Sequence, residues 1–199
     1  MEFAQVLARR RMCRDFLDQA VDPEIVDRVL ARARRAPSAG HTQGWSFVVL
    51  EGDAQTAAFW AHDAQPAWMA RPHHPGLLRA PVIIVPLASH QAYVERYAEA
   101  DKQTPTACGP QSWDVPYWLV DCSFATMVLL LAAGDEGLGA LFFALHGQAE
   151  TLLRALGIPG GWQPLGAVAL GWPAPGHRPS ASAGRGLRPL DEVVHRGGW

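Results

Sequence analysis

The spacing of apolar side chains predicts several helices in this 199-residue chain. The first has a clear start, because Asp22 can cap a helix whose first turn contains Pro23. Apolar side chains then recur every three or four residues up to Ala33, and Pro37 ends the run. Shorter helices are expected at residues 54–62, 91–98 and 151–156.

Shorter apolar runs between these helices predict strands. Residues 81–87 are apolar and rich in β-branched side chains, which is typical of a strand buried on both faces. Further strands are expected at residues 46–50, 138–143 and 165–170. Helices and strands alternate, but two strands follow long loops, so the sequence favours an α+β fold of mixed α/β layers in a single domain, residues 1–199.

Residues 117–136 predict one long helix with apolar side chains on more than one face. Such a helix is buried on all sides, either inside a 199-residue domain or in an obligate interface between chains. Its most apolar part, residues 124–133, is shorter than the ~20 residues needed to cross a bilayer. Polar residues flank this part, with Asp121 before it and Asp135 after it. No membrane association is therefore expected.

Composition narrows the class of protein. A net charge of -2 argues against a nucleic-acid partner, because phosphate binding needs a basic face. The three cysteines, Cys13, Cys108 and Cys122, have no CxxC spacing, so neither a disulfide framework nor a zinc site is expected. The first 14 residues are polar and contain no apolar signal segment, which indicates a cytoplasmic protein.

Common catalytic motifs are absent from the sequence. It contains no GxGxxG after a strand, no GxxxxGK[ST], no HExxH and no GxSxG. The adjacent His73 and His74 lie in a predicted loop with no carboxylate or cysteine at ligand spacing. We therefore predict no metal site.

Three segments contain residues that could bind a ligand, and each also has a purely structural interpretation. The arginines of residues 9–14 form either a solvated charge run or an anion site, since a guanidinium suits phosphate. Residues 36–45 are either an ordinary helix-to-strand connection or a loop whose glycines and exposed N–H groups admit a ligand. The arginines of the C-terminal segment belong either to a disordered basic tail or to a docked segment.

Taken together and in order, these segments resemble the FMN-dependent nitroreductase family. RRMCRDF (residues 10–16) is similar to the family's RRSxRxF, and APSAGHTQGWSF (residues 36–47) is similar to APSAGNxQPWxF. GLGA (137–140), LGIP (156–159), LGWP (170–173) and RPLDEVVH (188–195) match later family elements. The resemblance covers nearly the whole chain.

The resemblance implies a nitroreductase-like fold, with a central, mostly antiparallel sheet flanked by helices, in an intertwined homodimer. It also implies that the opening arginines hold the phosphate and polar tail of FMN, with Arg14 near the pyrimidine end of the ring. The loop from Pro37 would come from the other subunit, and the end of the 138–143 strand would lie along the ring. The implied FMN-binding residues are Arg10, Arg11, Met12, Arg14, Pro37, Ser38, Ala39, Gly40, His41, Gln43, Phe142, Phe143, Ala144, and Arg185 or Arg188.

By the same resemblance, NADH or NADPH would reduce the flavin, which would then reduce a nitroaromatic, a quinone or another planar acceptor. No catalytic side chain is needed, because the flavin supplies the chemistry. A stacking pocket for the acceptor is expected from aromatic side chains that could equally serve core packing or dimer contacts. These are Trp68, Trp113, Tyr117 and Trp118.

Four positions depart from the family pattern. Met12 replaces a serine, His41 an asparagine, Gly44 a proline and Leu187 an arginine. Two alternative functions stay open, the first because it needs the same ring environment as a reductase and the second because of the departures at Met12 and His41. One is an FMN-dependent tailoring dehydrogenase or oxidase acting on a biosynthetic intermediate, and the other is a non-catalytic flavin- or deazaflavin-binding protein.

Overall fold

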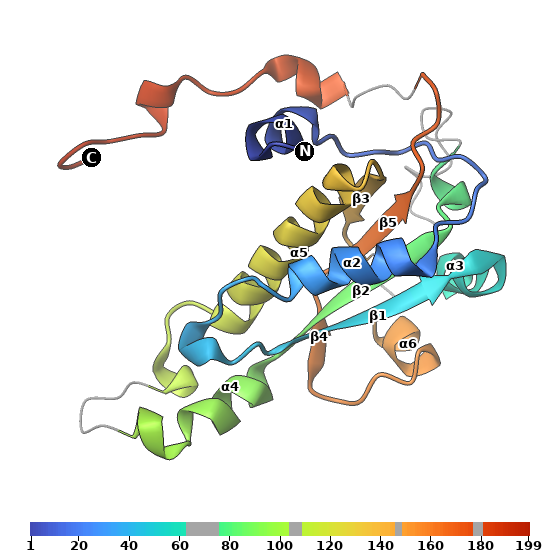
Figure 1. Ribbon diagram of the computed structural model, residues 1–199. Helices are drawn as coiled ribbons and strands as arrows, with labels where there is room; N and C mark the ends of the chain where they lie inside the picture. The colour runs from blue at the N-terminus through green and yellow to red at the C-terminus, as the bar shows by residue number, and fades with distance from the viewer. Residues whose placement is uncertain (63–75, 104–108, 146–148, 177–180) are drawn as a thin grey trace.

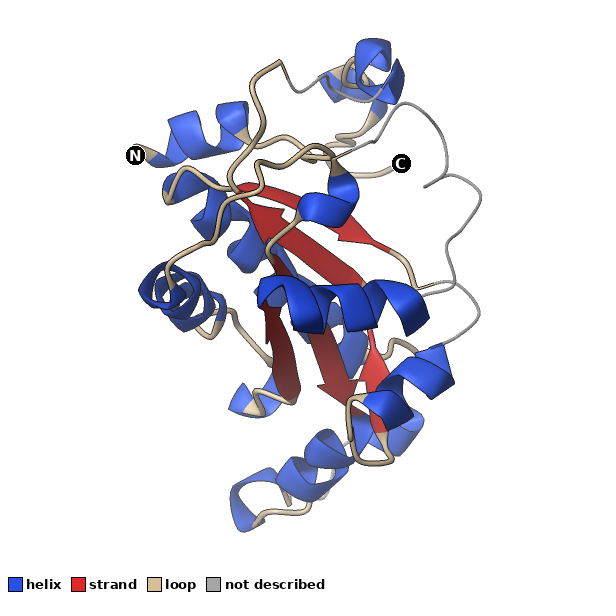
Figure 2. Cartoon of the chain, turned by 90° about the vertical axis from the view of Figure 1, so that its right-hand side faces the viewer, coloured by secondary structure: helices blue, strands red, loops and turns tan. Residues whose placement is uncertain are grey.

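The fold consists of a central β-sheet between two layers of helices (Figures 1 and 2). The structure is a computed structural model that describes residues 1–62, 76–103, 109–145, 149–176 and 181–199. The layered α+β fold predicted from the sequence is confirmed.

The sheet has five strands, and each strand pair is antiparallel. Neighbouring strands follow the order β1-β2-β5-β3, and β4 also pairs with β2. Their bounds are β1 (Trp45–Glu51), β2 (Val82–Ser89), β3 (Gly139–Phe143), β4 (Trp162–Pro164) and β5 (Ala167–Gly171).

Strand β2 connects the two hydrophobic cores, and all eight of its residues are buried. Because successive side chains of a strand point to opposite faces, Ile83, Val85 and Leu87 enter one core while Val82 and Ile84 enter the other. The first core includes side chains from α3 (Gly52–His62) and α6 (Ala149–Ala155), and the second includes side chains from α2 (Pro23–Ala33) and α5 (Tyr117–Asp135).

Local signals placed most helices correctly. The cap of α2 is confirmed, since Asp22 Oδ1 accepts the Glu24 N–H at 2.9 Å. The helix α4 (His90–Tyr97) also lies where the sequence predicted one. Two elements were missed: α1 (Phe3–Arg9), whose only buried residue is Val6, and the three-residue strand β4.

Helix α5 crosses the sheet from the loop before β1 to the region beneath α1 (Figure 1). It is long and apolar enough to span a membrane, yet Ala125, Leu129 and Ala133 are fully buried, so here it is a core helix. Of the two alternatives for this helix, the described residues of a single chain do not enclose it on all sides, because Phe124 and Met127 are 47% and 40% exposed. An interface between chains stays a prediction.

Candidate functional site

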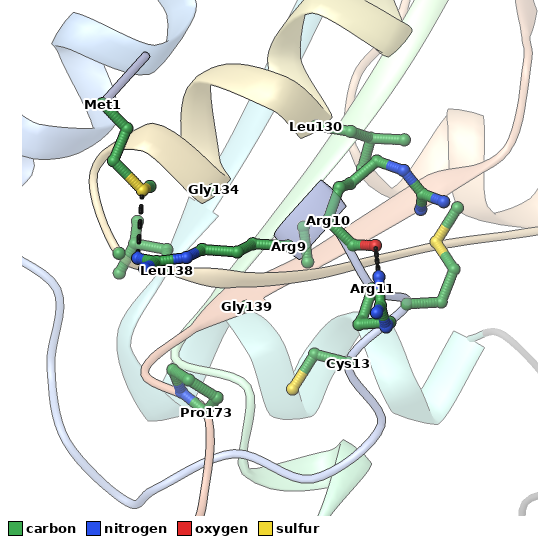
Figure 3. Close-up of a pocket in the computed structure, with 13 residues that line it drawn as sticks. Met1, Arg9, Arg10, Arg11, Cys13, Leu130, Gly134, Leu138, Gly139 and Pro173 are labelled. Carbon is green, nitrogen blue, oxygen red and sulfur yellow. Dashed lines mark hydrogen bonds between the residues drawn. The ribbon is translucent and has the colours of Figure 1, made fainter. Parts of the chain in front are cut away.

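The first part of the candidate site is the segment that follows α1. Residues 10–14 run along the start of β3, where Met12 pairs with Ala140 and the Cys13 N–H donates to the Ala140 carbonyl at 2.9 Å. This contact requires Gly139, since a Cβ there would lie 2.7 Å from the Cys13 side chain (Figure 3). The segment is therefore fixed by backbone pairing, and its arginine side chains are left to point outward.

Two cavities adjoin this segment. The smaller, about 320 Å³, lies between α1, the end of α5 and the start of β3 (Figure 3). The larger, about 880 Å³, is a groove between the arginines and the C-terminal segment, and we call it the arginine groove. It is lined by Leu7, Ala8, Arg10, Arg11, Met12, Arg14, Ser182, Ala183, Gly184, Gly186 and Leu187.

The positive charges of the arginine groove are not neutralised by neighbouring carboxylates. Arg11 Nη1 donates to the Ala8 and Arg10 carbonyls at 2.7 and 3.0 Å, and Arg14 Nη1 donates to the Met12 carbonyl at 3.2 Å. Among the described residues, Arg10, Arg11 and Arg14 form no ion pair with a carboxylate. Guanidinium groups that have no carboxylate partner favour the binding of an anionic ligand. This observation favours an anion site over a solvated charge run.

The two C-terminal arginines differ in position. Arg185 lies at the end of a short 3₁₀-helix, η5 (Ala181–Arg185), between groove residues Gly184 and Gly186. Arg188 instead donates to the Glu192 carboxylate at 3.3 Å and to the Glu192 carbonyl at 2.9 Å. Neither side chain lines the arginine groove in the single chain, although each follows a groove residue in sequence, and only Arg188 is paired with a carboxylate among the described residues.

The second part of the candidate site is the loop of residues 37–43, with its short helix η1 (Ala39–His41). The Ala39 N–H donates to Asp121 Oδ2 at 2.7 Å, and the Gln43 N–H donates to Ser38 Oγ at 2.9 Å. The His41 and Thr42 N–H groups donate to carbonyls of the loop itself. These four N–H groups therefore have partners within the protein, which does not agree with the alternative of a loop whose exposed N–H groups admit a ligand. The loop offers side chains instead, including the linked His41 Nε2 and Gln43 Nε2, 3.0 Å apart.

The loop has an uncommon backbone conformation. His41 and Gln43 have φ angles of 54° and 52°, in the left-handed region that L-residues other than glycine disfavour. Each costs on the order of 1 kcal/mol or more, and such residues persist where their surroundings hold them in place. Gly40, at φ 63°, brings the backbone close to Tyr97, whose ring would lie 2.9 Å from a Cβ at this position.

Helix α5 separates the two parts of the site. The loop is bound at Asp121, in the first turns of the helix, whereas Leu130 and Gly134, near its other end, line the cavity beside the arginine segment. Thirteen helical residues from Asp121 to Gly134 span about 20 Å. The two segments that the sequence assigned to one flavin site therefore lie far apart in a single chain (Figure 1).

At the end of β3, residues 142–144 are better placed to offer a ligand their backbone groups than their side chains. Phe143 is buried and stacks on Trp60 with ring centroids 5.4 Å apart, so its ring belongs to the core. Phe142 is partly buried against the opposite core, and Ala144 is exposed. Of these three, Ala144 is the one whose side chain is open to solvent.

The aromatic side chains predicted to bind an acceptor lie near the loop. Trp113 meets Tyr97 and Tyr117 edge-on, with centroid distances of 4.9 and 5.2 Å, and Tyr97 is the residue beneath Gly40. Trp118 packs separately against His90 at 4.5 Å. Trp68 lies outside the described residues, as do His73 and His74.

Three residues at the loop were not singled out in the sequence. Asp121 was taken as a polar flank of the apolar helix, but it is only 3% exposed and binds both the loop and the Tyr93 hydroxyl. Burial and this hydrogen bond raise the pKa of Tyr93. Arg96 donates from Nε to the Gly40 carbonyl at 2.9 Å. One signal for Asp121 was available, namely a carboxylate on a helix that is otherwise apolar all round.

The fold is a layered α+β fold, and its arginine groove has a lining that favours an anionic ligand. Comparison with known sequences narrows the class of protein, because the profile of the Nitroreductase family matches residues 7–172. The chain belongs to the nitroreductase family, a family of oxidoreductases, which confirms the resemblance seen in the sequence.

Individual relatives are moderately similar. An NADH dehydrogenase/NAD(P)H nitroreductase of Methanothermobacter thermautotrophicus is 27% identical over 184 residues, covering 89% of this chain and 82% of the relative. A 5,6-dimethylbenzimidazole synthase of Rhodospirillum rubrum is 28% identical over 173 residues, covering 84% and 80%. The crystal structure of a nitroreductase from Desulfovibrio desulfuricans in complex with FMN has a TM-score of 0.72 and 25% identity, covering 100% of this chain and 98% of that one.

Proposed function

We propose that the protein is a cytoplasmic, homodimeric FMN-dependent oxidoreductase that uses NADH or NADPH to reduce a planar acceptor such as a nitroaromatic or a quinone. The observation that carries this proposal is the separation of the two half-sites by the length of α5. Two chains related by a twofold axis, with their α5 helices antiparallel, would bring the loop of one chain to the arginine groove of the other. The exposed stripe of Phe124 and Met127 on α5 would then be covered.

The residues of the arginine groove fit FMN. Its volume of about 880 Å³ lies in the range of pockets that hold small molecules. Arginine forks match the phosphate, and Ala183, Gly184 and Gly186 allow the ligand to approach the backbone closely. The flavin, when bound, supplies the hydride and electron transfer.

The side chains of the chain have binding and positioning roles in this proposal. Arg10 and Arg11 would hold the phosphate and polar tail, with Arg185 added from the C-terminal segment, since Arg188 is already paired with Glu192. Arg14, oriented by its bond to the Met12 carbonyl, places a cation where negative charge accumulates on a reduced ring. From the partner chain, Ser38, His41 and Gln43 would line the edge of the ring and exclude water. Met12 is partly buried against both cores, so at this position the groove lacks the hydroxyl that a serine would provide.

The acceptor would stack beside the loop. The side chains proposed for this are Trp113, which meets Tyr97 next to Gly40, and Tyr117, which meets Trp113. Aromatic side chains favour flat ligands through face and edge contacts, so a planar acceptor is the natural class.

A second function has a specific observation in its favour. The R. rubrum relative is named for the synthesis of 5,6-dimethylbenzimidazole rather than for nitro reduction. A tailoring enzyme would use the same groove and the same loop but would not need a nicotinamide as the electron donor. Anaerobic mixing of the flavin-loaded protein with NADH and with NADPH separates the two: bleaching of the flavin band supports the reductase, and no bleaching with either supports the tailoring role.

The shared site can be tested with mixed dimers. One chain would have Arg10→Ala and Arg14→Ala, and the other Gly40→Val, which distorts the loop because Gly40 has φ 63°. If each site combines two chains, the mixed dimer has one intact site and binds about half as much FMN as the parent, with parental affinity. If each site lies within one chain, the mixed dimer contains no intact site, and the proposal of a shared site is lost.

A further inference from the structure

A buried polar cluster holds the loop of residues 37–43 against α5 and α4. Asp121 Oδ2 accepts two short hydrogen bonds, from the Ala39 N–H and from the Tyr93 hydroxyl, both at 2.7 Å. Asp121 and Tyr93 are 3% and 0% exposed. A carboxylate is costly to bury unless hydrogen bonds compensate it, and one of the two bonds here ends on the loop backbone.

Arg96, on α4, holds the same loop from a second direction. Its Nε donates to the Gly40 carbonyl at 2.9 Å. Its other two nitrogens donate to both Asp101 carboxylate oxygens at 2.6 and 2.7 Å, and Nη1 also contacts Glu99 at 3.0 Å. A guanidinium fixed by a two-point pair with a carboxylate keeps its third edge directed at one acceptor, here the loop.

Glycines let the loop rest directly on this cluster. A Cβ at Gly40 would lie 2.9 Å from the Tyr97 ring, and one at Gly44 would lie 2.4 Å from the Tyr93 ring. The Gly44 carbonyl also accepts the Ser89 N–H at 2.9 Å. Bonds at Ala39, Gly40 and Gly44 therefore surround His41 and Gln43, the two residues in the disfavoured left-handed conformation.

We infer that Asp121 and Arg96 are positioning residues that shape this loop before the flavin binds. The inference rests on the proposed function, because it is the flavin of the partner chain that the loop would meet. Neither residue needs to touch the flavin. A loop already held in its bound conformation loses little conformational freedom on binding, and affinity increases for that reason.

The first measurement needs no flavin. Amide hydrogen exchange of the flavin-free protein, followed in peptides covering residues 36–45, should be slow in the parent and at least tenfold faster in Arg96→Ala. The matched control is Glu95→Ala on the same helix, where the exposed Glu95 side chain accepts a hydrogen bond from Gln91. Equal exchange in Arg96→Ala and in the control would overturn the inference.

The second measurement is the dissociation constant of FMN, from fluorescence quenching on titration of the flavin-free protein. We expect Arg96→Ala to weaken binding about tenfold and to alter the visible circular dichroism of the bound flavin. Asp101→Asn separates positioning from simple stability. It removes one charge of the ion pair but leaves the contact of Arg96 with the loop, so its effect on the dissociation constant should be smaller.

The buried carboxylate is tested with two variants. Asp121→Asn retains an oxygen that can accept both hydrogen bonds and should bind FMN within about threefold of the parent, whereas Asp121→Ala removes the acceptor and should behave like Arg96→Ala. If Asp121→Ala does not fold, Tyr93→Phe removes the neighbouring hydroxyl with less disruption, and it should speed exchange of the loop. A parent protein that binds no FMN contradicts the proposed function. If the parent binds FMN and Arg96→Ala binds it equally tightly, only the positioning role is contradicted.

Discussion

The arginine groove and the loop of residues 37–43 hold their polar groups in opposite ways. At the arginine groove, three guanidinium groups have no carboxylate partner among the described residues, and the cavity is open and lined by residues near the two chain ends. At the loop, a buried carboxylate and a paired arginine fix the backbone in a disfavoured conformation.

This difference has a chemical reason. A phosphate with its flexible tail can be bound by mobile cations, since charge attracts over several ångströms and needs little geometric precision. A flat ring meets its surroundings at van der Waals distance, so the surface facing it must already have the right shape. The comparison shows that one site can combine a half whose charged groups are unpaired and adaptable with a half whose polar groups are paired and rigid.

The largest expected effect concerns the helix that joins the two ends. Leu129→Ala, in the buried middle of α5, should lower the free energy of unfolding by about 2–5 kcal/mol, because it removes apolar surface and leaves a cavity. Urea unfolding measures this. The control is the same truncation at Leu78, which is 48% exposed, where a change within about 0.5 kcal/mol is expected. Equal losses at the two positions would show that α5 is not the common core of both ends.

The next effect distinguishes the arginines from one another. Arg10→Ala should weaken FMN binding at least tenfold, since a charge-assisted hydrogen bond contributes about 1.5–3 kcal/mol and 1.4 kcal/mol corresponds to a factor of ten. Arg9 is a matched control, because it lines only the smaller cavity and its Nη1 lies 3.4 Å from Met1 Sδ (Figure 3). Fluorescence titration gives both dissociation constants. If Arg10→Ala keeps its flavin through extensive dialysis as well as the parent does, Arg10 does not contribute to FMN binding.

The smallest expected effect tests whether water is excluded around Cys122, at the end of α5 that holds the loop. Burial raises the pKa of Cys122, next to Asp121, from 9.0 to about 12. Between these values the unfolded thiol loses its proton while the folded thiol keeps it, so stability decreases as the pH rises. Above pH 9 the parent should lose about 1.4 kcal/mol per pH unit relative to Cys122→Ala.

Urea unfolding of both proteins at pH 8, 9.5 and 10.5 measures this difference. The advantage of the parent should shrink as the pH rises, in agreement with the sign of the shift. Parallel stability profiles across this range would show that Cys122 is accessible to water and that the loop end is not a dry, rigid half-site.

Much of the fold followed from local signals in the sequence. The cap at Asp22 and the periodic apolar face predicted α2, and the continuous apolar run predicted β2, because these patterns depend on residues close in the chain. Helix α1 and strand β4 lacked such signals. Only Val6 of α1 is buried, and β4 has three residues, too few for a period to be visible.

The candidate site was predicted in pieces. The order of its motifs identified the family and named the arginines and the loop, and the resemblance implied that the loop comes from the other subunit. It did not show that the two segments lie at opposite ends of α5. Asp121 and Arg96 were missed for the same reason, since their partners Ala39 and Gly40 are 82 and 56 positions away.

The sequence by itself determined the layered α+β class, most strands and helices, and membership of the nitroreductase family, because these follow from periodicity, capping and short motifs along the chain. Only the tertiary structure decided which charges are paired and which are free, which face of α5 is exposed, and which groups hold the loop. These properties depend on contacts between distant residues, and burial in a three-dimensional core turned the polar flank Asp121 into a buried anchor for the loop.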